Sequence, residues 1–183
     1  MVNILDFHTI NTNEIFKPYR AFGWLLHRGN IPQGTTTIWK LDDTVPRSEF
    51  GSIFFWVKGA IQIKLIGQEE NVTLLRSAGD LSLDFNATLG DLWSGSFETT
   101  ALEDSERWCI LKRYNRLTLP NINKLVLTVS SSVELPIGTK LLICRGTGML
   151  TGNIVVEGPQ TITVTSSDII LTATTDIYGL YFT

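Results

Sequence analysis

The stretch from Ser52 to Phe85 constrains the fold more than any other part of the chain, because its hydrophobic pattern has the period of β-strands. Ser52–Lys58 and Ala60–Ile66 are rich in β-branched and aromatic residues, and the second segment alternates apolar with polar side chains. Gly59 between them permits the positive φ that a tight hairpin requires. Two further strands continue the pattern: Asn71–Arg76 and Asp80–Phe85. We therefore predict an antiparallel β-sandwich, with Trp56 and a neighbouring Phe facing its core.

The rest of the chain is also predicted to be β-structure, since no segment has the length and period of a helix. From Arg116 onward the aromatic residues become few and Thr, Ser, Val and Ile predominate, with turns marked by Gly and Pro. We place a boundary near Pro120. This divides the chain into a larger domain, 1–119, and a smaller antiparallel β-sandwich unit, 120–183.

Two short segments of the first part have weak counterparts in the second. Pro32–Thr35 resembles Pro136–Thr139, and Val72–Leu83 resembles Ile162–Leu171. The chain could contain two related β-units, or the similarity could be chance, because short β-motifs resemble one another easily.

The segment from about Thr44 to Leu111 resembles the cupin superfamily of jelly-roll barrels. The family motif has a hydrophobic strand that ends in Gly, a turn, a second strand and then Gly-Asp, which correspond here to Ser52–Lys58, Gly59, Ala60–Ile66 and Gly79-Asp80. The resemblance implies a cupin-like jelly roll. It concerns the pattern of strands and turns and does not extend to the residues of the family's metal site.

The metal-ligand positions of that family are not retained. With Gly59 aligned to the closing glycine of the first motif, Ser52 stands at the position of the metal-binding Glu, Arg47 or Ser48 at the second His, and Val45 or Pro46 at the first. Ser82 stands where the second motif has its His. The resemblance thus implies a barrel without the family's metal, and we expect no cofactor and no metal site.

Composition excludes several classes of function. The chain has 183 residues and a net charge of −3, with no basic cluster, so we expect no nucleic-acid partner. It has no apolar run of membrane-spanning length and no signal-like N-terminus, so we expect no membrane association and synthesis in a cytoplasm. The two cysteines, Cys109 and Cys144, lie in apolar segments and are predicted to be buried and reduced.

No set of catalytic residues can be recognised. His8 and His27 are flanked by apolar residues, and their spacing gives no reason to expect convergence on a metal. Acidic residues such as Asp80 and Asp84 fit turn capping better than catalysis. The five tryptophans all lie in the first part of the chain, and one or two at a barrel mouth would form a binding platform.

Two hypotheses follow. The first is a non-enzymatic structural protein, most consistent with a phage or virus virion component, such as a capsid decoration protein or a tail module. It would be made in the host cytoplasm and act through contacts with other protein subunits or as a homo-oligomer. The alternative is a metal-free cupin-like protein or enzyme that binds a sugar or small acid through Trp56, Trp93, Asp80 and Asp84.

Overall fold

The computed structural model describes residues 8–10, 15–40, 50–67, 71–83, 93–113 and 121–183, and within them the side chains of 17–38, 53–66, 71–81, 97–110 and 121–183. These residues form β-strands and turns, as predicted, and contain no helix. None of their segments is therefore a helix long and apolar enough to cross a membrane. The chain forms two compact units: unit 1 is Met1–Arg20 with Trp24–Leu119, and unit 2 is Ala21–Gly23 with Pro120–Thr183.

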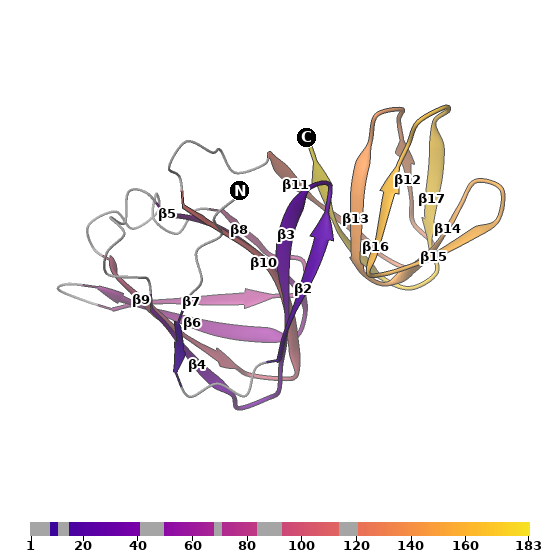
Figure 1. Ribbon diagram of the computed structural model, residues 1–183. Coiled ribbons are helices and arrows are strands. Elements are labelled where there is room, and N and C mark those ends of the chain that lie inside the picture. Colours follow the sequence, from indigo (N-terminus) through magenta and orange to yellow (C-terminus); the bar gives the residue numbers. More distant parts are fainter. Residues whose placement is uncertain (1–7, 11–14, 41–49, 68–70, 84–92, 114–120) are drawn as a thin grey trace. The chain divides into compact units, whose positions relative to one another are not determined.

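Unit 1 consists of two five-stranded antiparallel sheets (Figure 1). The first has the order β1-β4-β9-β6-β7, and the second has the order β2-β3-β10-β5-β8. The strands of the first sheet are β1 (His8–Ile10), β4 (Thr36–Lys40), β9 (Trp93–Ala101), β6 (Ala60–Gly67) and β7 (Val72–Ser77). Those of the second are β2 (Ile15–Ala21), β3 (Trp24–Ile31), β10 (Ser105–Arg113), β5 (Phe50–Lys58) and β8 (Leu81–Leu83).

Unit 2 consists of two four-stranded antiparallel sheets, β11-β18-β13-β16 and β12-β17-β14-β15 (Figure 1). The strands of the first are β11 (Ile122–Leu127), β18 (Ile177–Phe182), β13 (Lys140–Arg145) and β16 (Gln160–Thr163). Those of the second are β12 (Ser132–Leu135), β17 (Ile169–Ala173), β14 (Thr147–Leu150) and β15 (Ile154–Glu157).

Both units have the nested pairing of a jelly roll. In unit 2 the first strand pairs with the last and each following strand pairs one step inward, as β11 with β18, β12 with β17, β13 with β16 and β14 with β15. In unit 1 the same nesting joins β3 with β10, β4 with β9, β5 with β8 and β6 with β7. The expected jelly roll is confirmed, and the smaller unit, which we predicted as an antiparallel β-sandwich, has the nested pairing of a jelly roll too.

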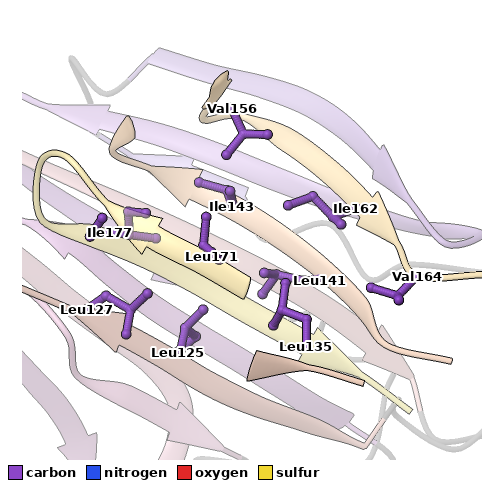
Figure 2. Close-up of a cluster of buried hydrophobic side chains, with 11 residues drawn as sticks. Leu125, Leu127, Leu135, Leu141, Ile143, Val156, Ile162, Val164, Leu171 and Ile177 are labelled. Carbon is purple, nitrogen blue, oxygen red and sulfur yellow. The ribbon is translucent and has the colours of Figure 1, made fainter. Parts of the chain in front are cut away.

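The two interiors are filled by different kinds of side chain. Unit 1 buries aromatic residues, including Phe54, Phe55 and Trp56 of β5, which confirms the predicted aromatic core. Unit 2 buries aliphatic residues: Leu125, Leu127, Leu135, Leu141, Ile143, Val156, Ile162, Val164, Leu171, Ala173 and Ile177, most of which are labelled in Figure 2. These aliphatic side chains come from both sheets and point toward one another, so they hold the two layers together.

The first turn of each nested hairpin is closed in the same way. In unit 1 the turn between β3 and β4 is closed by a hydrogen bond from Thr35 N–H to Pro32 O, 3.1 Å, with Gly34 at φ 78°. The carboxylate of Asp104, in the turn between β9 and β10, accepts a hydrogen bond from Gln33 N–H at 2.9 Å. We call this arrangement a carboxylate-capped turn.

Unit 2 has the equivalent turn between β11 and β12. Ser131 N–H donates to Thr128 O at 3.0 Å, and Asp176, in the turn between β17 and β18, accepts from Val129 N–H at 2.9 Å. Ser130 takes the place of glycine there and has φ 67°. The two units therefore close the same end of the hairpin with the same contacts.

The similar sequences Pro32–Thr35 and Pro136–Thr139 both form turns, but at different places in the two jelly rolls. Pro136–Thr139 is also a carboxylate-capped turn, in which Asp168 accepts from Ile137 N–H at 2.9 Å. However, it joins β12 to β13, whereas Pro32–Thr35 joins β3 to β4. The similarity thus marks a repeated turn geometry at positions that are not equivalent in the two jelly rolls.

A glycine packs against the aspartate turn in each unit. A Cβ on Gly59, which follows β5, would lie 2.5 Å from Asp104 O and 2.9 Å from Ser105 Cα. A Cβ on Gly146, which follows β13, would collide in the same way with Asp176 O and would lie 2.9 Å from Ile177 Cα. Only glycine lets the chain pass this close to the turn.

Gly59→Ala and Gly34→Ala separate this packing from backbone strain, because both glycines have nearly the same φ, 77° and 78°, and Gly34 has open space around its Cβ position. We expect Gly34→Ala to lower the free energy of unfolding by about 1–2 kcal/mol. Gly59→Ala should lower it by about 1–3 kcal/mol more, through the clash with Asp104 and Ser105. Urea unfolding measures both, and equal losses would contradict the packing.

Candidate ligand site in unit 1

The buried polar groups of the described residues lie in unit 1. They are Thr35, Thr37, Thr99, Ser105, Glu106 and Arg107. In unit 2 the described side chains that are buried are apolar, and the close-up in Figure 2 shows hydrocarbon against hydrocarbon. Buried polar groups cost free energy unless they are hydrogen-bonded or paired. Three of them, Thr37, Thr99 and Arg107, occupy strand positions that face the interior of unit 1, which is therefore the candidate site.

One face of β5 and β10 points into the barrel. Phe54 of β5 contacts Phe97 of β9, which belongs to the opposite sheet, with ring centroids 6.0 Å apart and nearly perpendicular. The strand register sets Phe54 opposite Cys109 and Trp56 opposite Arg107. Because alternate residues of a strand share a face, these four side chains all face the interior.

Arg107 is the most unusual member of this face. Its side chain is 0% exposed, although guanidinium groups are seldom fully buried. Its Cζ atom lies 5.6 Å from the ring centroid of Phe54, within the range of a cation–π interaction. The barrel interior thus holds a positive charge against an aromatic wall.

Trp56 provides a second donor beside it. The Trp56 ring is 1% exposed and stacks on Phe54 at a centroid distance of 6.0 Å, with 20° between the ring planes. Its indole Nε1 is buried and has no hydrogen-bond acceptor among the described residues. An indole N–H can only donate, so this position is suited to an acceptor atom from outside that part of the protein.

Two buried threonines lie on the facing sheet. Thr37 of β4 and Thr99 of β9 are opposite each other in the register, and their side chains are 0% and 1% exposed. Thr99 shares its face of β9 with Phe97, so it also points inward. Their hydroxyl groups can donate or accept, which widens the range of groups that this interior can bind.

The neighbouring residues of β10 point to the opposite face of the sheet and form a separate polar cluster. Glu106 is 1% exposed and pairs with the guanidinium of Arg28. Arg28 also lies over Trp108, 5.7 Å from the ring centroid, and Tyr19 packs edge-on against the same ring at 5.3 Å. This ion pair has its own aromatic surroundings and is not part of the interior site.

Of the four residues predicted to bind a ligand, the structure places Trp56 in the interior. Asp80 follows β7 and accepts a hydrogen bond from Ser77 N–H at 2.8 Å, which is turn capping. Trp93 is the first residue of β9 and pairs with Gly67, and its side chain lies outside the described side chains. Asp84 lies outside the described residues altogether. The described contacts do not bring these four side chains together.

The residues at the family's metal-ligand positions are likewise not brought together by the described contacts. Ser52 lies in β5 and Ser82 in β8, while 45–48 lie outside the described residues. His8 belongs to β1 and His27 to β3, which are strands of different sheets. The described part of the chain has no group of three or more His, Cys, Asp or Glu side chains that could hold a metal ion.

Arg107 was not among the residues singled out from the sequence. The available signal was the pair Glu106-Arg107 at the start of an otherwise apolar strand. Alternation places one of two adjacent strand residues inside, and the pairing of Arg107 with Trp56 and of Cys109 with Phe54 shows that it is Arg107. This pairing of strands that are distant in the chain is not visible in the sequence.

Comparison with known proteins identifies the fold. No protein-family model matches the sequence, and a search of curated proteins finds no match. Solved structures match over nearly the whole chain. A cupin 2 conserved barrel domain protein from Leptotrichia buccalis has a TM-score of 0.51 at 9% identity, covering 99% of this chain and 97% of its own.

Two further structures give the same result. Quercetin 2,3-dioxygenase from Acinetobacter baumannii has a TM-score of 0.53 at 11% identity, with 99% of this chain and 84% of that chain covered. AerE from Microcystis aeruginosa has a TM-score of 0.53 at 11% identity, with 98% of each chain covered. The chain therefore has the fold of cupin-family proteins. A virion role finds no support in these comparisons and stays a prediction.

The Arg28–Glu106 pair predicts a coupled response to mutation. Glu106→Leu leaves Arg28 without this carboxylate in a partly buried place, and Arg28→Met removes the cation that pairs with the buried carboxylate, so each should lower the free energy of unfolding by about 3 kcal/mol. The double variant should lose less than the sum of the two, by about 1–3 kcal/mol. A double-mutant cycle in urea measures this difference, and strict additivity would contradict the pairing.

Proposed function

We propose that unit 1 binds a small carboxylic acid inside its barrel, through Arg107 and Trp56. The observation that carries the proposal is the fully buried guanidinium of Arg107, set opposite Trp56 on the inward face of β5 and β10. A guanidinium has several N–H donors, and it can donate to a carboxylate that enters the interior. The buried indole N–H of Trp56 is a second donor for the same anion.

The chemistry of the two donors favours a carboxylate. The guanidinium is a planar fork whose parallel N–H groups match the two oxygens of a carboxylate. The rings of Phe54 and Phe97 line the same interior and suit the hydrocarbon part of the acid. Arg107 is the one cation among the buried side chains of the described residues, which favours an acid of low charge.

The fold is compatible with this role. The interior of a barrel of this size is either filled by side chains or holds one small ligand, and ligand sites are found at the mouths of such barrels. Quercetin 2,3-dioxygenase, a neighbour with the same fold, is named as an enzyme. One fold hosts many activities, so the proposal for this chain rests on Arg107 and Trp56 and is limited to binding.

The barrel must open for the acid to enter. Arg107 and Trp56 are 0% and 1% exposed, so side chains that cover them have to move before an anion reaches either donor. Binding that requires such a change is slower than diffusion alone allows. We therefore expect the association rate constant of the acid to lie well below the diffusion limit.

The indole N–H of Trp56 provides a direct readout in the wild-type protein. In a proton–nitrogen NMR spectrum of the labelled protein, Trp56→Phe identifies the Trp56 indole signal among those of the five tryptophans. Acetate, benzoate and succinate are then added in turn, with glucose as the neutral control and sodium chloride at matched ionic strength. We expect a saturable downfield shift of this signal with an acid alone, because the N–H gains an acceptor. No shift with any acid at millimolar concentration would overturn the proposal.

Variants of Arg107 test the guanidinium. Arg107→Lys keeps the charge but loses the fork, and we expect about a tenfold weaker affinity for the acid; Arg107→Met should weaken it about a hundredfold. Lys140→Met removes an exposed positive charge from unit 2 and should leave the affinity unchanged. Calorimetric titration measures each affinity. Unaltered binding in a folded Arg107→Lys variant would assign the ligand to another site.

A further inference from the structure

We infer that β15 is a self-association edge, at which two copies of the chain pair antiparallel through Val155. This inference concerns unit 2 and does not depend on the ligand proposed for unit 1. It rests on the exposure of β15, on the direction of its backbone groups and on a register in which the strand complements itself.

β15 is an edge strand with unusual exposure. It is the last strand of the sheet β12-β17-β14-β15, so one side of its backbone has no neighbouring strand in that sheet. Ile154 is 58% exposed and Val155 64%. Exposed edges normally carry charged side chains or proline, because an apolar edge is a template for pairing with another chain.

The other edge strands of unit 2 are better protected. β16 exposes Gln160, Thr161 and Thr163, and β12 exposes Ser132 and Glu134. β11 exposes Asn123 and Lys124 beside Val126. Only β15, among these four edges, presents two large aliphatic side chains in succession, which makes it the strand most suited to pairing.

The backbone of β15 fixes the residues that can pair. Gly158 N–H donates to Gly146 O at 2.9 Å, and the same register continues through Gly148 opposite Val156 and Leu150 opposite Ile154. In an antiparallel ladder alternate pairs exchange hydrogen bonds, so Val156 and Ile154 bond to β14. The N–H and C=O of Val155, between them, therefore point toward the free edge.

A two-fold axis through Val155 makes the strand complementary to itself. Val155 then lies opposite the partner's Val155 as a hydrogen-bonded pair, and both chains use the groups that point outward. In the same register Ile154 lies opposite the partner's Val156, and Glu157 lies opposite the turn that precedes the partner's β15, so the two Glu157 side chains do not oppose one another. Like charges directly opposite would disfavour pairing, and this register avoids them.

The pairing is centred on Val155 rather than on Glu157. Glu157 N–H already donates to Gln160 Oε1 at 3.1 Å, within its own chain. Val155 shares the outward face of its sheet with Met149, which is opposite it on β14 and 36% exposed, and with Ile170 of β17, which is 51% exposed. Association would place these side chains on one apolar face that continues from Met149 to the partner's Met149.

Sedimentation velocity over a range of protein concentrations tests the inference. We expect the wild-type chain to form a concentration-dependent dimer, and Val155→Lys to abolish it by placing two positive charges at the axis. Leu75→Lys is the matched control, because Leu75 is 66% exposed on β7, an edge strand of unit 1. A wild-type chain that stays monomeric at millimolar concentration overturns the inference, and so does a dimer lost only with Leu75→Lys.

A cysteine variant tests the pairing of Val155 with the partner's Val155 without a change of charge. Val155→Cys should form an intermolecular disulfide under mild oxidation, since Cα atoms of such a pair lie about 5.5 Å apart, within disulfide range. The native Cys109 and Cys144 are buried and should not react. Val126→Cys places the same thiol on another exposed strand position of unit 2. Equal cross-linking of the two variants would overturn the pairing at Val155.

Discussion

Each jelly roll depends on one aspartate in the turn before its last strand. Asp104 and Asp176 use two different groups at once: the carboxylate accepts a hydrogen bond from the first turn of the hairpin, and the main-chain carbonyl meets the glycine that follows the third strand of the nest. Three segments that are distant in the sequence thus converge on a single residue. The outermost strand pair of a nested hairpin closes the longest loop, so it has the largest cost in loop-closure entropy. Contacts that join the chain segments at this end offset part of that cost.

The two units combine the same closure with different interiors. Unit 2 fills its interior with aliphatic side chains and buries no polar side chain among the described residues. Unit 1 contains aromatic rings, two threonines and a guanidinium in the corresponding space. A purely apolar interior contributes stability with no specificity for a ligand, whereas a charged one reduces stability and gives a point of recognition. The difference in composition between the two interiors is therefore the main functional signal in the molecule.

The sequence predicted those features that depend on local pattern. The strands around Gly59 follow from the alternation of Ala60–Ile66 and from the β-branched and aromatic residues on both sides, and Asp80 acts at a turn, as acidic residues at strand ends commonly do. The jelly roll of unit 2 was not predicted, because its strands are short and uniform and carry no motif. Arg107 was missed because the pairing of β10 and its burial depend on strands that are distant in the sequence.

The closing contacts are formed by backbone atoms, a glycine and one carboxylate, and none of them requires a particular interior residue. Substitutions at inward positions that keep the interior packed therefore leave these closing contacts intact and change what the barrel contains. Structures that share this fold at 11% identity are consistent with such freedom. In a fold that is closed in this way, the binding properties of the interior depend on the side chains at a few inward positions.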